Sequence, residues 1–211
     1  MNIRLFFSVI ITLCAMTALP AHAEGDIAKG EALSQTCLGC HGVPGLRNPS
    51  PVYRVPMIGG QHASYLEAAM KAYKNKQRSH PTMQAQTANL NDTDIKNIAA
   101  YFANLKQDSK PFVKAGAAAG KEKAVGCAGC HGLDGKADTD AARASSFPVL
   151  AGQYDDYLER VLLDYKSGSR TNGVMNGITA GLSKKDIKQL ARWFRSQSGT
   201  LNAPVLSLIH I

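Results

Sequence analysis

The sequence contains two copies of one unit, so we expect the chain to form two similar structural units. Cys37-Leu38-Gly39-Cys40-His41-Gly42 matches Cys127-Ala128-Gly129-Cys130-His131-Gly132 at an offset of 90 residues. After a two-residue insertion the offset becomes 92, where Gly60-Gln61 matches Gly152-Gln153, and further matches extend the repeat over roughly 75 residues. Because a solenoid needs more than two repeats, we expect two small domains, each needing more than a hydrophobic core for stability.

Each unit is predicted to be helical, since no segment alternates convincingly between apolar and polar residues with the period of a strand. The first helix should run from Asp26 toward the first cysteine, matched by residues 117–125 in the second copy. A middle helix is expected at residues 63–75, matched by 155–166, with apolar residues spaced for one helix face.

The last helix of each unit is predicted from its capping residues. Asn91 and Ser183 suit the N-cap position, and an aspartate follows each of them three residues later, as in a capping box. Gly30 and Gly120 occupy equivalent places in the first helices, where glycine costs about 1 kcal/mol relative to alanine. Their recurrence favours a role in close helix packing.

Residues 1–23 are predicted to be a secretory signal peptide. Arg4 precedes an apolar run of 15 residues, and Ala21-His22-Ala23 supplies a cleavage site. The run is shorter than the roughly 20 residues of a transmembrane helix, so an uncleaved anchor is the less favoured alternative. Cleavage after Ala23 would leave 188 residues with four cysteines.

The remaining chain is predicted to form two domains, residues 24–108 and 109–200, followed by a short apolar tail of unknown role at 201–211. The boundary should lie in the polar, proline-interrupted segment 106–114. Without the leader, 23 basic and 16 acidic residues give a charge of +7, with no basic run. Nucleic-acid binding is therefore not expected, whereas acidic protein surfaces or anionic lipid head groups are possible docking partners.

The C-x-x-C-H motif is the attachment sequence of haem c. The thiols of Cys37 and Cys40, and of Cys127 and Cys130, have the spacing that reaches two vinyl groups of one porphyrin. A shared zinc site would need cysteine pairs about 15 to 20 residues apart, but 87 positions separate Cys40 from Cys127. Disulfides would not explain the adjacent histidines, and a thioredoxin-like pair needs a βαβ context. Two covalent haem c groups are the prediction.

Four residues are predicted to bind the two irons. His41 and His131 follow the cysteines directly, and Met83 and Met175 come 42 and 44 residues later in matching register. Methionine as the sixth ligand raises the reduction potential, whereas an empty position would permit catalysis.

Other residues of the first copy could also bind iron, but none has a suitable counterpart in the second copy. These pairs are Met57 with Val149, Met70 with Leu162, His62 with Tyr154, and His80 with Asn172.

Further residues are predicted to support the haem groups. Pro56 and Pro148 could present a carbonyl to the free N–H of the histidine ligand, although a plain loop proline is the alternative.

Two repeated pairs of polar residues are harder to assign. Arg78 and Arg170, five residues before each methionine, could neutralise haem propionates, or they could simply be exposed. Tyr65 and Tyr157 are expected to pack between helices rather than to touch the haem.

Together these motifs resemble the cytochrome c4 family, within the class I c-type cytochromes, over nearly all of residues 25–198. The resemblance rests on the paired CxxCH motifs, the Pro-x-x-x-Gly-Gln segments, the Arg-x-x-x-x-Met spacing and the Leu-x-x-x-Asp-Ile helices. It implies an all-α fold of two tandem class I cytochrome c domains with approximate two-fold symmetry and haem edges near the interdomain face. It also implies His/Met ligation of both irons. The first copy departs from the family with Met57-Ile58-Gly59 and a proline-rich loop.

The expected function is that of a periplasmic dihaem electron-transfer protein, free or loosely attached to the cytoplasmic membrane. Its redox partners would be a quinol-oxidising cytochrome bc-type complex and a haem-copper terminal oxidase or another reductase. We expect no enzyme activity and no small-molecule substrate. One alternative is the dihaem subunit of a flavocytochrome c sulfide dehydrogenase. Another is a small dihaem peroxidase or thiosulfate-oxidising enzyme, which needs an open iron that the matched methionines argue against.

Overall fold

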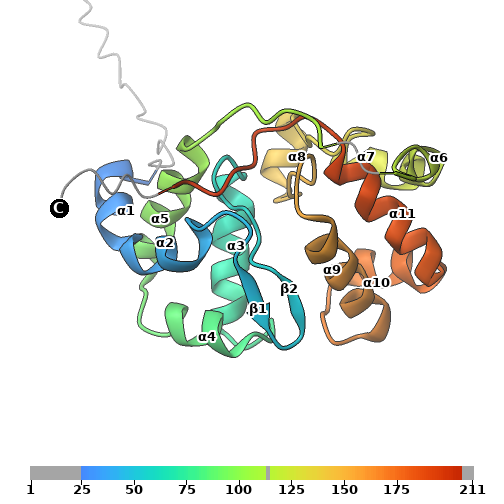
Figure 1. The fold of residues 1–211 in the computed structure, drawn as a ribbon. Coiled ribbons are helices and arrows are strands. Elements are labelled where there is room, and N and C mark those ends of the chain that lie inside the picture. Colours follow the sequence, from blue (N-terminus) through green and yellow to red (C-terminus); the bar gives the residue numbers. More distant parts are fainter. Residues whose placement is uncertain (1–24, 113–114, 206–211) are drawn as a thin grey trace, which may run out of the picture.

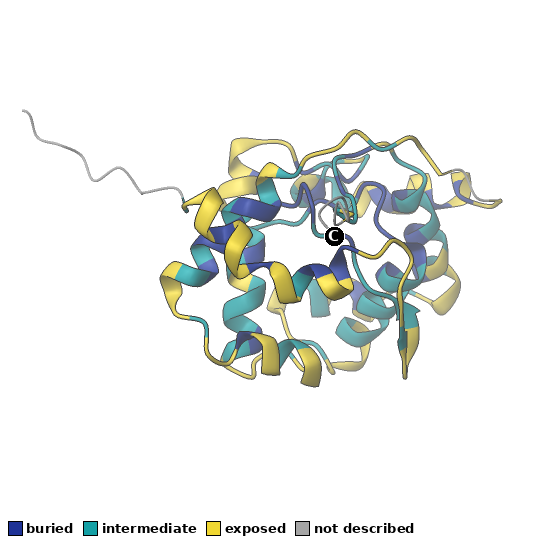
Figure 2. Ribbon diagram, turned by 60° about the vertical axis from the view of Figure 1, so that its left-hand side comes forward, coloured by how far each residue is buried: buried dark blue, intermediate teal, exposed yellow. Residues whose placement is uncertain are grey.

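The computed structural model describes residues 25–112 and 115–205 and has two helical halves side by side (Figure 1). The predicted signal peptide and the last six residues of the tail lie outside the described residues. The all-α prediction is confirmed. Buried residues line the inward faces of the helices, while the outer turns are exposed (Figure 2). No helix of the described part is long and apolar enough to cross a membrane.

In its described residues the first half has five helices and one short hairpin, drawn in blue to green in Figure 1. The elements are α1 (Ile27–Leu33), α2 (Gln35–His41), β1 (Arg47–Pro49), β2 (Val52–Arg54), α3 (Ala63–Lys74), α4 (Pro81–Thr87) and α5 (Asp92–Asn104). Helices α1 and α3 both pack on α5. Leu66, Ile98 and Phe102 lie in the core of this half.

Within its described residues the second half has helices and connecting loops but no named strand, and it is drawn in yellow to red. Its elements are η1 (Ala118–Gly120), α6 (Lys121–Ala124), η2 (Val125–Cys127), α7 (Ala128–His131), α8 (Asp140–Ala144), α9 (Asp155–Ser167), α10 (Gly173–Ala180) and α11 (Lys184–Arg195). Helix α11 packs on α9 and η1, as α5 packs on α3 and α1. Leu158, Leu190 and Phe194 form its core.

Two expectations about secondary structure need correction. The predicted single first helix is broken at Ser34, which has φ −88° and ψ 0° and separates α1 from α2. The antiparallel hairpin β1–β2, which pairs Arg47 with Arg54, was not expected. Its strands have only three residues each, too few to show an alternating pattern.

Both predicted capping boxes are present and fix where the last helix of each half begins. The side chain of Asn91 accepts a hydrogen bond from Asp94 N at 2.9 Å, and the Asp94 carboxylate accepts one from Asn91 N at 3.0 Å. Ser183 and Asp186 make the same exchange at the start of α11. These bonds satisfy amide groups that the helix itself leaves unpaired.

The packing role predicted for Gly30 and Gly120 is confirmed. A Cβ atom at Gly30 would collide with the backbone carbonyl of Asn97 in α5, and one at Gly120 would collide with the carbonyl of Gln189 in α11. The first helical segment of each half can therefore approach the last helix only because these positions lack a side chain.

A reciprocal pair of glutamines joins the two halves. The side chain of Gln61 accepts from Val149 N at 2.8 Å and donates to Val149 O at 3.0 Å. The side chain of Gln153 makes the same two bonds to Met57: it accepts from Met57 N at 3.1 Å and donates to Met57 O at 2.9 Å. Gln61 and Gln153 are repeat counterparts, as are Met57 and Val149, so the interface follows the predicted two-fold relation.

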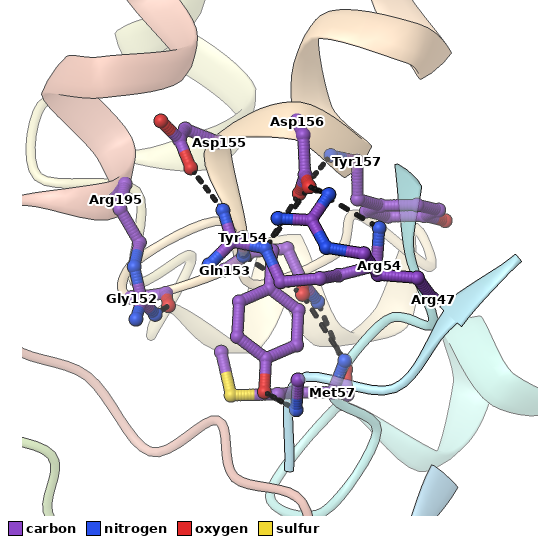
Figure 3. A network of polar contacts seen from close by, with 11 residues as sticks. Arg47, Arg54, Met57, Gly152, Gln153, Tyr154, Asp155, Asp156, Tyr157 and Arg195 are labelled. Carbon is purple, nitrogen blue, oxygen red and sulfur yellow. Dashed lines mark hydrogen bonds and ion pairs between the residues drawn. The ribbon is translucent and has the colours of Figure 1, made fainter. Parts of the chain in front are cut away.

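A second set of contacts between the halves has no such symmetry (Figure 3). Arg54, at the end of the hairpin, lies 2.9 Å from the carboxylate of Asp156 and 2.5 Å from that of Asp155. Its guanidinium group also lies 4.5 Å from the centre of the Tyr154 ring. The Tyr154 hydroxyl accepts a bond from Gly45 N at 2.9 Å. The hairpin therefore anchors the first half to the start of α9.

The C-terminal segment returns across the molecule and lies against the first half, as the red coil in Figure 1 shows. Asn202 forms two backbone hydrogen bonds with Gly59, and its side chain donates to Leu105 O at 2.6 Å. Leu201 is buried with Met57 and Val149. The beginning of the predicted tail is thus part of the interface between the halves.

Replacing Gln61 by alanine should destabilise the interface, because it leaves the buried N–H and C=O of Val149 without partners. Each orphaned group costs about 1 to 3 kcal/mol. Urea unfolding of the haem-loaded protein measures the loss in the free energy of unfolding. Gln153→Ala should lower that free energy by a similar amount. Gln107→Ala, at an exposed glutamine, is the matched control. Equal stabilities of the Gln61 variant and this control would contradict the assignment.

Candidate haem sites

Both CxxCH motifs face one cavity of about 760 Å³ that is bounded by the two halves. All the predicted attachment and ligand residues line it: Cys37, Cys40, His41 and Met83 from the first half, and Cys127, Cys130, His131 and Met175 from the second. The structure therefore brings together every residue that the sequence assigned to the haem groups.

The cysteines are held on short helical segments at the edge of this cavity. The first pair lies on α2, while in the second copy Cys127 ends η2 and Cys130 lies on α7. None of these four cysteines forms a disulfide, and burial raises the pKa of the Cys37 and Cys127 thiols. Within the described residues, no cluster of histidine, cysteine and carboxylate groups could hold a separate metal ion.

The two histidines are oriented as the proline prediction requires. His41 Nδ1 lies 2.8 Å from Pro56 O, and His131 Nδ1 lies 3.1 Å from Pro148 O. Because a carbonyl only accepts hydrogen bonds, Nδ1 must carry the proton, which leaves the lone pair on Nε2. Burial lowers the pKa of both imidazoles, and the carbonyl bond offsets part of this shift. A neutral imidazole with a free Nε2 suits a metal ion.

The two methionines occupy the same place on matching helices. Met83 N donates to the N-cap residue His80 at 3.3 Å, and Met175 N donates to Asn172 at 3.0 Å. One turn later, a buried threonine donates its hydroxyl proton back to the methionine carbonyl at 2.9 Å in α4 and 2.8 Å in α10. These paired bonds fix the backbone of both methionines at the cavity wall.

The rival ligands have other contacts in the structure. His80 caps α4 through Nδ1, and His62 Nδ1 lies 2.9 Å from Phe147 O of the other half. Met57 is buried in the interface cluster, and Met70 packs against the core of the first half.

Inside the cavity, an arginine of each half donates a hydrogen bond to a tyrosine of the other half. Arg78 donates to the Tyr157 hydroxyl at 3.1 Å, and Arg170 donates to the Tyr65 hydroxyl at 3.4 Å. We expected these tyrosines to pack between helices, and the structure adds that both line the cavity and bond to an arginine of the opposite half. Their partners lie in the other copy, so sequence spacing gave no signal for these pairs.

The charge in this region favours an anionic group. Among the described residues, neither Arg78 nor Arg170 forms an ion pair with a carboxylate, and each guanidinium group stacks on a tyrosine of its own half. Burial alone would raise the pKa of Tyr65, but the two guanidinium groups lower it to about 8. Two positive charges without carboxylate partners, facing a cavity, fit the propionate groups of haem.

Comparison with known proteins gives matches over both halves. A family model described as Cytochrome c matches residues 27–106 and again residues 117–198. Cytochrome c4 of Pseudomonas aeruginosa is 34% identical over 207 residues, which cover 91% of this chain and 98% of that protein. The crystal structure of reduced recombinant cytochrome c4 from Pseudomonas stutzeri has a TM-score of 0.71 at 31% identity, covering 82% of this chain and 99% of that chain.

Relatives with other names are also similar to this chain. The thiosulfate dehydrogenase electron acceptor of Thiomonas intermedia is 25% identical over 203 residues, covering 89% of this chain and 90% of that protein. The cytochrome subunit of sulfide dehydrogenase of Chlorobaculum tepidum is 35% identical over 98 residues, covering 46% of this chain and 84% of that protein.

Replacing Cys37 and Cys40 together by alanine should leave one covalent haem per chain instead of two, because only the second pair can still form thioether bonds. Mass spectrometry of the denatured protein counts the attached groups. The matched variant with Cys127 and Cys130 replaced should show the same loss. Two haems in either variant would contradict the assignment of one haem to each pair.

Proposed function

Because the chain belongs to the cytochrome c family and is a dihaem protein of the cytochrome c4 type, we propose that it carries electrons in the periplasm. It takes them from a quinol-oxidising complex and passes them to a terminal oxidase or reductase. The two CxxCH motifs attach two covalent haem c groups, which supply one-electron chemistry when bound. The observation that carries this proposal is that each half offers a histidine and a methionine to the same cavity.

The proposed ligands are His41 and Met83 for the first iron, and His131 and Met175 for the second. The Pro56 and Pro148 carbonyls support this by fixing the imidazole rings. An iron with six ligands has no free position for a substrate, and it changes oxidation state with little rearrangement. This arrangement favours a carrier over an enzyme.

The proposed path of electrons crosses the interface between the halves. Both sites open into one cavity, and Arg78 and Arg170 lie between them with tyrosines of the opposite half. In our proposal these guanidinium groups neutralise the haem propionates and so permit two charged cofactors to lie close together. Residues 24–108 and 109–200 are the two proposed domains, and the N-terminal 23 residues support export to the periplasm.

A second candidate function is that of an electron-accepting subunit of a sulfur-oxidising complex. The similarity to a thiosulfate dehydrogenase electron acceptor and to a sulfide dehydrogenase cytochrome subunit favours it. In that role the same two haem sites would receive electrons from a tightly bound catalytic protein. Stable co-purification with such a protein would favour this candidate, whereas a free protein would favour the respiratory carrier.

The optical spectrum with carbon monoxide tests the proposed ligands. We expect the weak red band of a methionine–iron bond in the oxidised protein, and no spectral change when carbon monoxide is added to the reduced protein. Met83→Ala or Met175→Ala should each remove about half of the band and open one iron to carbon monoxide. Met70→Ala, at a partly buried methionine that packs against the core of the first half, is the control. Binding of carbon monoxide by the unaltered protein would place an enzyme ahead of a carrier.

Replacing Arg78 or Arg170 by glutamine should lower the reduction potential of the haem in the same half by tens of millivolts. A nearby positive charge favours the reduced iron, which carries one positive charge less than the oxidised iron. Spectroelectrochemical titration measures the change. Arg143→Gln, at an exposed arginine of α8, should leave both potentials within a few millivolts. An unchanged potential in both cavity variants would argue against propionate binding.

A further inference from the structure

His62, at the start of α3, joins the first half to the loop behind the second haem site. Its Nδ1 lies 2.9 Å from Phe147 O, so the neutral imidazole donates a hydrogen bond through this nitrogen. The neighbouring Gln61 holds Val149 of the same loop, and its side-chain oxygen also accepts a bond from His62 N at 3.0 Å. Two consecutive residues of the first half therefore hold residues 147–149 of the second.

This loop contacts the proposed iron ligand of the second half in two ways. Pro148 O accepts the hydrogen bond from His131 Nδ1 at 3.1 Å, and the centre of the Phe147 ring lies 6.1 Å from that of the His131 ring. The residue that His62 binds thus directly precedes the proline that orients His131. His62 is therefore one residue away from the contact that positions the ligand.

The reverse contact, from the second half to the first, has different chemistry. The repeat places Tyr154 opposite His62, and the Tyr154 hydroxyl accepts a hydrogen bond from Gly45 N at 2.9 Å. An imidazole can gain a positive charge in the physiological pH range, whereas a phenol cannot. The two halves therefore differ in whether the neighbouring half can place a titratable cation behind the haem site.

The second ring nitrogen of His62 can take up a proton. The side chain is half-buried, and no group of the described residues binds Nε2. Protonation at Nε2 leaves the bond from Nδ1 to Phe147 O in place, because both nitrogens of an imidazolium are donors. The contact thus persists in both protonation states, and only the charge of the ring changes.

Three charged side chains act on the His62 imidazole, namely Arg143 of α8, Lys106 after α5 and Asp138 before α8. Burial has the largest effect and lowers the pKa of His62, while the bond to Phe147 O raises it. Arg143 and Lys106 lower the pKa further, and Asp138 raises it. Because the pKa lies below its usual value of 6.5, the ring is neutral at neutral pH and becomes charged in acidic solution.

We propose that His62 is a positioning residue that couples the reduction potential of the second haem to pH. A nearby positive charge stabilises the reduced iron, which carries one positive charge less than the oxidised iron. When this iron accepts an electron, Nε2 of His62 binds a proton from water more tightly, and oxidation releases that proton to water again. The inference rests on the proposed electron-transfer function and adds that a residue of the first half tunes the haem of the second.

The proposal predicts a single step in the potential of the second haem. The potential is constant while His62 is neutral in both oxidation states, and it rises as the pH falls through the pKa of the reduced state. It is constant again below the pKa of the oxidised state. We expect reduction to strengthen proton binding at His62 about threefold, which raises the potential by about 30 mV at 59 mV per tenfold change.

NMR of the haem-loaded protein measures both sides of this coupling. The methyl resonances of each haem, assigned by their contacts with Met83 or Met175, report its reduction separately in redox titrations from about pH 5 to about pH 8. The ring protons of His62 give its pKa in the fully oxidised and the fully reduced protein. This second measurement does not depend on electron-transfer activity.

His62→Asn separates the charge of the ring from its contact. The asparagine amide can donate to Phe147 O in the place of Nδ1, but it does not titrate. We expect this variant to keep the stability of the unaltered protein and to lose the step of the second haem. His80→Asn is the matched control, because it makes the same exchange in the first half and introduces the residue of its counterpart Asn172. This control should keep the step.

Two further variants move the step and leave His62 and its bond unchanged. Lys106→Gln removes a cation, so the pKa of His62 rises and the step should move to higher pH. Asp138→Asn removes an anion, so the step should move to lower pH. Both side chains are exposed, and these variants therefore decide the question even if His62→Asn fails to fold.

A step that persists in His62→Asn, or an equal pKa of His62 in the two oxidation states, would overturn the proposal. Steps that stay in place in both the Lys106 and the Asp138 variants would do the same. Failure of the carrier function gives a different result, because the unaltered protein would then lack reversible reduction of one or both haems at every pH. Reversible haems without the step contradict only the role of His62.

Discussion

The reciprocal hydrogen bonds of Gln61 and Gln153 are the contacts on which the arrangement of both haem sites depends. Each glutamine satisfies a backbone amide and a carbonyl of the opposite half, in a buried place where unpaired groups would be costly. The residues they hold, Met57 and Val149, directly follow the prolines whose carbonyls orient the histidines. One interaction therefore fixes the relation between the halves and supports the loop behind each proposed iron ligand.

Symmetry and asymmetry serve different purposes in this molecule. The repeated features are internal: the cysteine pairs, the proline carbonyls, the capped methionine helices and the crossed arginine–tyrosine pairs. The features that differ are the hairpin with Arg54 and the C-terminal segment against Gly59. Duplication thus supplies two equivalent haem sites, and the unrepeated segments hold the two halves together.

The chemistry of the site could be predicted from the sequence because its signals are local. Each CxxCH motif and each capping box is defined by spacing within one copy, and Met83 and Met175 stand out because they match each other when the two copies are aligned. The contacts between copies could not be predicted in this way. The repeat of Gly-Gln was visible, but the partners of Gln61 and Gln153 lie in the other half. The arginine–tyrosine pairs could not be predicted for the same reason. The hairpin could not be predicted because strands of three residues are too short to show an alternating pattern of apolar and polar residues.

Because the two haem sites share a cavity across a fixed interface, we propose that they form one electron-transfer unit. Intramolecular electron transfer after rapid partial reduction of the loaded protein tests this claim most directly. We expect the electron to redistribute between the haems in a first-order process whose rate constant does not change with protein concentration. A rate that rises in proportion to concentration would show that the haems exchange electrons only when molecules collide, and it would contradict the account.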